Sequence, residues 1–290
     1  MTAVATATLL VATAGCVPKP PPPAAGAYFG PTKPFREVVG LINANNQKIP
    51  SLWARANVDA WLVDEKKRET FVNGDNGTVL YRAPAEFRFA AADSIKGNLF
   101  DLGVNGDTYW MRAYGSVDTM WWGNVRNLGK PCTADIPVQP MLISQVLGVG
   151  TINSNLLAEP APVMRFDNDA DAYVVTWQVR FPDRWVAQRE VWYDRATLRP
   201  SRVRLYDEDG RALLRAALYD HAPVDGAGGA TVATAYDLDF PDTGTRMRLR
   251  LRDAGLDNGS GVPNDRSFRL PDPDRAGVKN VNQIDAACGP

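Results

Sequence analysis

Hydrophobic and polar residues alternate along most of the chain, and this period of two is its strongest structural signal. Between residues 246 and 252, Met247, Leu249 and Leu251 alternate with four arginines. Such alternation is typical of a β-strand with one face buried and the other in water. About ten or eleven segments are predicted as strands on this pattern, namely 54–62, 78–82, 87–89, 98–104, 107–113, 173–181, 185–194, 201–206, 212–219, 235–240 and 246–252.

Asn-Gly pairs punctuate these segments and indicate tight turns between antiparallel strands. Asn105-Gly106 predicts a two-residue hairpin between the segments 98–104 and 107–113. Asn73-Gly74 and Asn76-Gly77 predict a further hairpin that leads into the segment 78–82.

Only two segments show helical spacing. Phe35, Val38 and Ile42 recur at that spacing and predict an amphipathic helix over roughly 34–48, while 138–147 predicts a short helix. Two helices cannot fully cover ten strands, and sheets of that size curl or close. The sequence therefore predicts a mainly β fold: an open, strongly curved antiparallel sheet, an unclosed barrel, with helices over its concave apolar face.

The N-terminus resembles a bacterial lipoprotein signal. Residues 12–16 read Ala-Thr-Ala-Gly-Cys after an apolar stretch, and Cys16 would become the acylated residue. Thr13 stands where such signals usually carry Leu, and residues 1–15 contain no Lys or Arg. Alternatively, this is a disordered tail with an incidental cysteine. Pro18 and the prolines that follow it predict an extended spacer behind the anchor.

The chain has three cysteines, and lipidation of Cys16 would leave an even pair. We therefore predict a disulfide between Cys132 and Cys288, the alternative being two free thiols. A zinc site is not expected, because there is no Cys-x-x-Cys pair and only one histidine. We expect no cofactor.

Composition sets the remaining limits. The formal net charge is −1 and no basic cluster is present, which argues against nucleic acid as a partner. We expect a monomer made of a signal segment (1–16), a proline-rich linker (17–33), one domain (34–275) and a C-terminal tail (276–290).

The chemistry of catalysis is poorly represented. His221, the single histidine, lies in a turn-like stretch between Asp220 and Pro223, and no Gly-x-Ser-x-Gly motif is present. A hydrolase with an unrecognised site is the weakest of the functional hypotheses, and we expect no enzyme.

Several stretches resemble the family of outer-membrane lipoprotein carriers and receptors (the LolA/LolB type). They are VVGLINAN (38–45), IPSLWARANV (49–58), LFDLGVNGDTYWMRA (99–113), REVWYDRATLRPSRVRLYDEDGR (189–211) and FPDTGTRMRLRL (240–251), in the family's order across about 35–271. The resemblance implies an unclosed antiparallel barrel whose concave apolar face is lidded by helices and accommodates acyl chains. This chain is longer than the usual member near 115–170 and at the C-terminus.

Eight tryptophans and many other large apolar residues could line such a cavity. Arg189 shares a predicted strand register with Ala187, Val191 and Tyr193, and as an inward arginine it would need a partner such as a carbonyl group or an acidic head group. An ordinary packed core is the alternative for each of these residues. The candidate ligand-binding residues are Phe87, Phe89, Phe100, Leu102, Tyr109, Met111, Leu142, Val146, Tyr173, Val175, Trp177 and Arg189.

These observations lead to a functional hypothesis. The chain would be a lipid-anchored periplasmic protein that binds lipid or the acyl chains of a lipoprotein, for transport or acceptance at the membrane. Val17 is not the Asp associated with inner-membrane retention, so the outer membrane is favoured. The alternative is a structural or interaction lipoprotein of the cell envelope whose cavity is packed.

Overall fold

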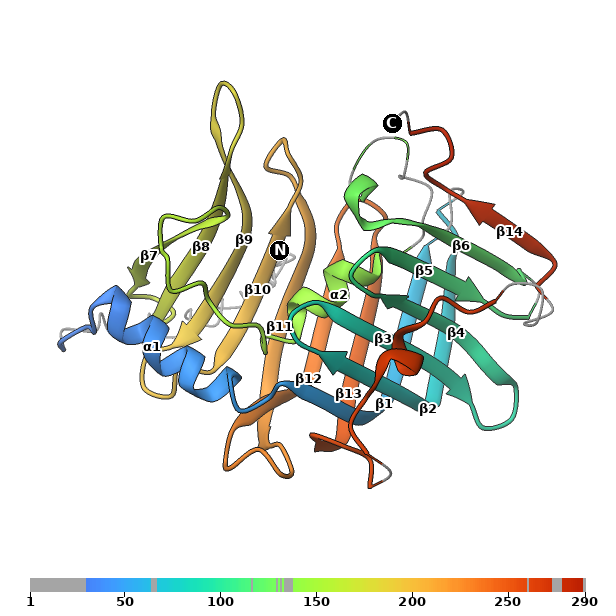
Figure 1. The fold of residues 1–290 in the computed structure, drawn as a ribbon, viewed down its shortest axis with the longest axis horizontal. Coiled ribbons are helices and arrows are strands. Elements are labelled where there is room, and N and C mark those ends of the chain that lie inside the picture. Colours follow the sequence, from blue (N-terminus) through green and yellow to red (C-terminus); the bar gives the residue numbers. More distant parts are fainter. Residues whose placement is uncertain are drawn as a thin grey trace, which may run out of the picture.

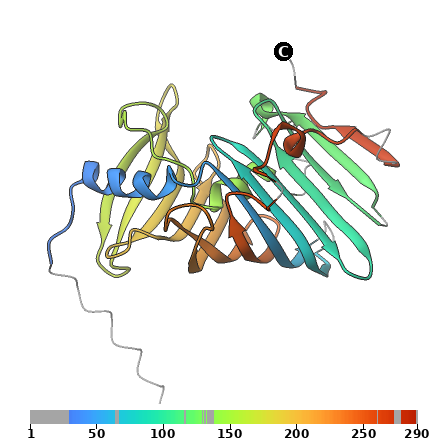
Figure 2. The ribbon, with the colours of Figure 1, turned by 60° about the horizontal axis from the view of Figure 1, so that its bottom comes forward.

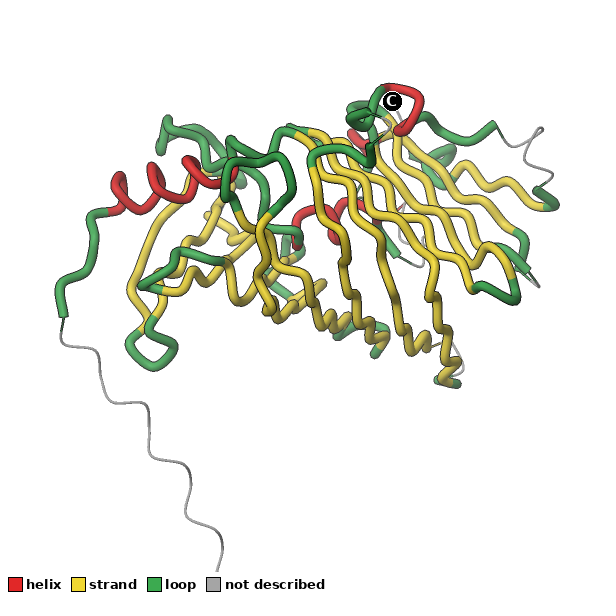
Figure 3. Tube along the Cα trace, turned by 90° about the horizontal axis from the view of Figure 1, so that it is seen from below, coloured by secondary structure: helices red, strands yellow, loops and turns green. Residues whose placement is uncertain are grey.

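The computed structural model describes residues 30–63, 67–115, 117–128, 130, 132, 138–259, 261–272 and 278–288. One curved, unclosed sheet dominates this part of the chain (Figure 1). The strands lie side by side along the whole molecule (Figure 3). Cys16 and residues 17–29 lie outside the described residues, so the lipid anchor stays a prediction.

The sheet contains fourteen strands within the described residues, in the order β14-β6-β5-β4-β3-β2-β1-β13-β12-β11-β10-β9-β8-β7. All neighbours pair antiparallel except β14 and β6, which run parallel. The strands are β1 (Ser51–Val63), β2 (Glu69–Arg82), β3 (Glu86–Asp93), β4 (Gly97–Val104), β5 (Thr108–Ala113), β6 (Thr119–Asn124), β7 (Ala161–Asp167), β8 (Ala172–Arg180), β9 (Trp185–Asp194), β10 (Pro200–Tyr206), β11 (Ala212–Pro223), β12 (Thr231–Phe240), β13 (Thr245–Gly255) and β14 (Asn280–Gln283).

The predicted fold class is confirmed, although the sheet has more strands than the ten or eleven expected. Two of the three additional strands, β6 and β14, lack alternation, whereas in β7 the exposed Val163 and Arg165 alternate with the partly buried Met164 and Phe166. In β6, Met120 is buried on one face and Gly123 on the other, so no polar face marks the strand. All four residues of β14 are exposed, so it has no apolar face at all.

The hairpin predicted at Asn73-Gly74 and Asn76-Gly77 is wrong, because all four residues lie inside β2. The register between β1 and β2 shifts opposite these glycines. A Cβ atom on Gly77 would lie 2.9 Å from the carbonyl oxygens of Ala56 and Ala90. These glycines therefore allow neighbouring backbones to approach closely within the sheet. By contrast, the hairpin between β4 and β5 is confirmed, although its loop comprises three residues, 105–107, and not the two predicted.

One face of the sheet carries a continuous apolar core, and both helices contribute to it. Helix α1 (Phe35–Asn46) buries Val38, Val39 and Ile42, while α2 (Pro140–Val146) packs against β3, β4 and β5. α1 lies over the half of the sheet that includes β8 and β9, and α2 lies near the middle (Figures 1 and 2). The helices thus cover the apolar face, as the alternating pattern requires.

Asparagines fix α1 to the chain beneath it. The Asn43 side chain donates to the Ile152 carbonyl and accepts from the Ile152 N–H, both at 2.8 Å. The Asn46 amide donates to the carbonyls of Gly148 and Gly150 at 3.1 and 2.8 Å. These bonds satisfy backbone groups of a segment that belongs to neither helix nor strand.

The opposite face is polar over β11 to β13 and β1. Arg248 faces Asp237 across the strands at 3.4 Å, and Arg246 pairs with Glu69 at 2.8 Å. These side chains are about half exposed, so each pair adds only about 0–1 kcal/mol. These charged pairs make the outer face polar, so it remains exposed to water.

Over β3 to β5 the same outer face is covered by a C-terminal segment that includes the short helix η3 (Asp265–Phe268), where Phe268 is buried. Arg88 binds both carboxylate oxygens of Asp101 at 3.0 and 2.6 Å and donates to the Ser267 carbonyl at 3.2 Å. These contacts tie the segment to β3 and β4, and Figure 2 shows its backbone passing beside the sheet.

Trp110 is fully buried on this outer side of β5 and lies directly over Gly103 of β4. A Cβ atom on Gly103 would lie 2.3 Å from Cζ2 of the Trp110 indole. Glycine at this position is therefore a steric requirement for the indole to lie across β4.

The last described residues return to the sheet. Cys288 forms a disulfide with Cys132, as the cysteine count predicts. Asp285 is only 4% exposed, and its Oδ2 accepts hydrogen bonds from the backbone and side-chain amides of Asn124 and from Asn127, at 2.7–2.9 Å. Although the boundary at 275 stays a prediction, β14 belongs to the same sheet as the domain.

Partial burial alone would raise the pKa of the Asp285 carboxyl. The amide donors of Asn124, Asn127 and Gln283 outweigh burial and hold that pKa well below its ordinary range. The ionised carboxylate is therefore the form that stabilises the C-terminal attachment.

We predict that Gly103→Ala lowers the free energy of unfolding by about 1–3 kcal/mol, because the new methyl group must displace a buried indole. Urea denaturation measures this change. Gly106→Ala is the matched control, since a Cβ atom added there would meet no other atom within 4 Å. Equal stability of the two variants would contradict the steric role of Gly103.

We predict that Asp285→Asn lowers the free energy of unfolding at neutral pH by about 1.5–3 kcal/mol, the range for hydrogen bonds to a charged group. The folded-state pKa is depressed, so this contribution is present above the ordinary pKa of about 3.9 and is lost as pH falls below it. The stability difference between wild type and variant should therefore shrink below about pH 4. Exposed Asp169→Asn serves as the control, and a difference that does not depend on pH would contradict the role of the carboxylate.

Candidate functional site

The predicted ligand-binding residues lie on the inner face of the sheet or on α2, in or against one core. Phe87, Phe89, Leu102, Tyr109 and Met111 are buried on β3 to β5. Phe100 is partly buried, and its ring meets that of Phe89 edge to face at 5.0 Å. Because α2 packs on these strands, this part of the inner face is occupied by the protein itself.

The second group lies on β8 and β9, at the other end of the inner face. Tyr173, Val175 and Trp177 are buried, and the Tyr173 hydroxyl accepts a hydrogen bond from the Lys33 backbone N–H at 2.6 Å. Val146 of α2 is also buried in the same core. The structure therefore gathers the predicted residues on one face but packs most of them.

The strand register predicted for Arg189 is wrong for Ala187, which does not share the face of Arg189. The pairing of β8 with β9 runs from Trp177 and Arg189 directly to Gln178 and Ala187, so Gln188 is skipped. Because of this bulge, the residues of β9 before Gln188 face the opposite way from the predicted alternation, so Val186 rather than Ala187 lies on the buried side. Val191 and Tyr193 remain on the face of Arg189.

The half-buried Arg189 side chain points to aromatic partners. Its guanidinium carbon lies 4.1 Å from the centre of the Trp177 ring, a cation–π contact. Burial lowers the pKa of the guanidinium, while the Tyr193 and Tyr81 side chains raise it. Its role in ligand binding stays a prediction.

A cavity of about 580 Å³ opens at the rim where three hairpins of the sheet end. This volume lies within the range of about 300–1,000 Å³ that is typical of ligand pockets. Leu142 of α2 is the only predicted residue that lines it. Apolar side chains make much of the wall, namely Leu128, Val138, Leu142, Phe181, Val186, Leu213 and Phe240.

Two β-bulges shape this cavity. Gln188 is skipped in the pairing of β8 with β9, and Leu213 is skipped in the pairing of β10 with β11. Both residues line the cavity. Bulges redirect side chains and are common beside binding sites. Strict alternation hides such positions, which is why sequence reasoning missed this part of the wall.

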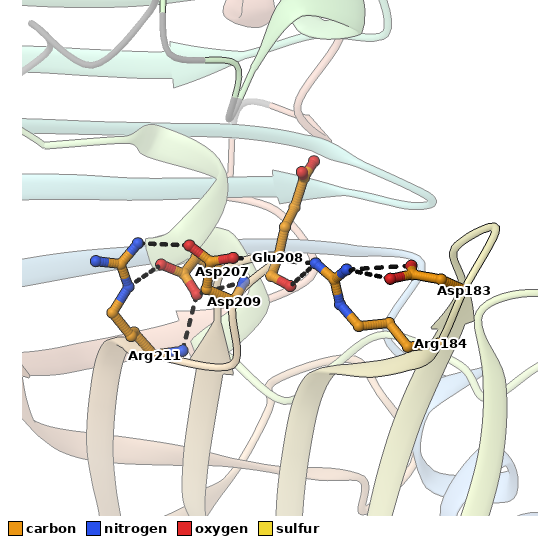
Figure 4. A network of polar contacts seen from close by, with 6 residues as sticks. All are labelled: Asp183, Arg184, Asp207, Glu208, Asp209 and Arg211. Carbon is orange, nitrogen blue, oxygen red and sulfur yellow. Dashed lines mark hydrogen bonds and ion pairs between the residues drawn. The ribbon is translucent and has the colours of Figure 1, made fainter.

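The rim is polar and is held by two hairpin turns (Figure 4). Arg211 contacts Asp207 at 3.1 Å and Asp209 at 2.6 Å within the β10–β11 turn. Arg184, in the β8–β9 turn, pairs with Asp183 and donates to the Glu208 carbonyl at 3.3 Å. The two turns are thereby connected across the mouth of the cavity.

The turn predicted around His221 is wrong, because this residue lies in β11 opposite Ala233. Burial lowers the pKa of its imidazole, and nearby Arg199 lowers it further. Among the described residues, no cluster of three or more His, Cys, Asp or Glu side chains could hold a metal ion, and no helix is both long and apolar enough to cross a bilayer.

No protein-family model and no curated protein matches the sequence. Solved structures do match. One, named as an outer membrane lipoprotein-sorting protein domain from Vibrio parahaemolyticus, is 12% identical with a TM-score of 0.50, covering 81% of this chain and 95% of that one. A LolA superfamily protein from Nitrosomonas europaea is 14% identical with a TM-score of 0.49, covering 83% of this chain and 99% of that one. A DUF1329 family protein from Desulfovibrio piger is 13% identical with a TM-score of 0.42, covering 82% of this chain and 98% of that one.

The first of these matches covers most of both chains and supports the fold described above. The chain has a LolA/LolB-like fold, as the sequence resemblance implies. At this level of identity the likeness concerns the fold alone.

Proposed function

We propose that the protein binds lipid, or the acyl chains of a lipoprotein, at the cavity on the rim of the sheet. The observation that carries this proposal is the cavity of about 580 Å³ with its wall of Leu, Val and Phe side chains. An apolar wall holds an acyl chain without specific hydrogen bonds and gains about 0.8 kcal/mol for each CH₂ removed from water. No covalent chemistry is needed for such a function.

The proposed location is the periplasmic side of the cell envelope, with an anchor at Cys16 and the outer membrane favoured over the inner. The lipoprotein-like residues 12–16 and the prolines that follow support the anchor. The disulfide between Cys132 and Cys288 supports an oxidising compartment. A tethered carrier or acceptor would remain close to the membrane whose lipid it handles.

A second candidate is a structural or interaction lipoprotein with no cargo. Eleven of the twelve predicted ligand-binding residues do not line the cavity, and buried ones such as Phe89 and Val175 are packed against the protein's own helices and strands. This observation favours a filled interior over most of the sheet. The two candidates differ in whether the rim cavity takes up a ligand.

Uptake can be tested with N-phenyl-1-naphthylamine, an uncharged apolar dye, together with native mass spectrometry of the purified protein for bound lipid. We expect saturable dye binding to wild type. Leu142→Trp should weaken it about tenfold or more, because the indole fills space that the ligand would occupy. Leu157→Trp is the matched control, since Leu157 is 90% exposed and lies outside the cavity lining.

Thermal unfolding of both variants checks that the fold is retained. Lipid-free protein that does not bind the dye would support the interaction lipoprotein instead. Equal dye binding by wild type and Leu142→Trp would place any lipid site elsewhere.

A further inference from the structure

More carboxylates than cationic side chains surround the cavity. Among the described residues, two cationic side chains, Lys130 and Arg211, line it together with four carboxylates, Asp207, Glu208, Asp209 and Asp242. The carboxylates lie in the turns that follow β10 and β12, at the polar end of an otherwise largely apolar space.

The cations at the rim are already engaged. Arg211 is held by Asp207 and Asp209, and the Lys130 ammonium donates to the Asn127 side-chain oxygen at 2.8 Å. Arg184, just outside the lining, is held by Asp183 and by the Glu208 carbonyl. An anionic head group would have to compete with the carboxylates that hold Arg211.

Two carboxylates are not engaged in this way. Within the described part of the chain, the exposed side chains of Glu208 and Asp242 have no hydrogen-bond or ion-pair partner. They are the groups that an incoming positive charge would meet. The mouth therefore complements a cation.

We infer that the cavity selects an amphiphile with one apolar chain and a positively charged polar end. The inference rests on the proposed function and names its ligand class. The chain would occupy the wall formed by Leu142, Val186 and Phe240, and the cation would lie beside Glu208 and Asp242. An anionic amphiphile of equal chain length binds more weakly, because its charge meets the excess of carboxylates.

The selectivity is moderate, since both carboxylates are exposed to water. An exposed ion pair contributes a factor of roughly 1.5 to 5 in affinity. Two such carboxylates together give a preference of about tenfold at low ionic strength. Salt screens exposed charges, so the preference decreases as the Debye length falls from about 10 Å at 0.1 M to about 3 Å at 1 M.

The test is displacement of N-phenyl-1-naphthylamine from the full chain at pH 7 by dodecyltrimethylammonium and dodecanoate, each below its critical micelle concentration, and by dodecanol below its solubility limit. We expect the cationic amphiphile to displace the dye at about one-tenth of the dodecanoate concentration, with dodecanol between them. In 1 M salt the three should converge.

In the double variant Glu208→Gln, Asp242→Asn, the three amphiphiles should displace the dye at similar concentrations, each compared with that variant's own dye affinity. Asp169→Asn is the control, because Asp169 lies in the β7–β8 turn, at the end of β8 away from the cavity. Dye binding with equal displacement by all three amphiphiles, or stronger displacement by dodecanoate, would overturn the charge selectivity and leave the proposed function intact. No dye binding by wild type would overturn both.

Discussion

Burial of one apolar face by an unclosed sheet is the constraint on which the rest of the structure depends. A closed barrel hides its inner face within itself, but an open sheet needs other parts of the chain to cover it. Here α1 and α2 provide cover, helped by the segment that Asn43 and Asn46 hold in place. Most of the inner face is consequently packed, and the cavity of about 580 Å³ opens where the cover by α2 ends.

The open sheet also leaves two edges, formed by β7 and β14. An uncovered edge offers unpaired backbone groups to other chains. On one side β6 is paired by β14, which is short and polar, and the attachment of β14 is reinforced by Asp285 and by the disulfide at Cys288. The C-terminal residues thus complete the sheet, although they carry no apolar pattern of their own.

Alternation in the sequence predicts the curved sheet because most strands have one buried face and one face exposed to solvent. Met247, Leu249 and Leu251 face the core, while their arginine neighbours form ion pairs on the outer face. The same reasoning fails at positions whose secondary structure is set by contacts between segments distant in the sequence. Gly77 was assigned to a turn, yet it lies within β2 because two neighbouring backbones pass close to it.

The candidate site was harder to predict for a related reason. A bulge changes which residues face inward, and Gln188 and Leu213 are skipped by pairings that no local pattern reveals. Large apolar residues such as Phe89 and Trp177 do lie on the inner face, but a sequence does not show whether a ligand or the protein fills the space beside them. The helical spacing over 138–147 does predict Leu142, and the structure shows that this helix borders both the core and the cavity.

This double role of α2 limits what the cavity can hold. Leu142 forms part of the cavity wall, while Ile143 and Val146 of the same helix are buried in the core beside β3 to β5. A ligand that extends from this cavity toward β3 to β5 would have to move α2, and that movement would expose Phe87 and Leu102 to water. Each fully exposed side chain of this kind costs about 1.5–3 kcal/mol. One acyl chain can enter without that cost, whereas a larger ligand must offset it through its own burial.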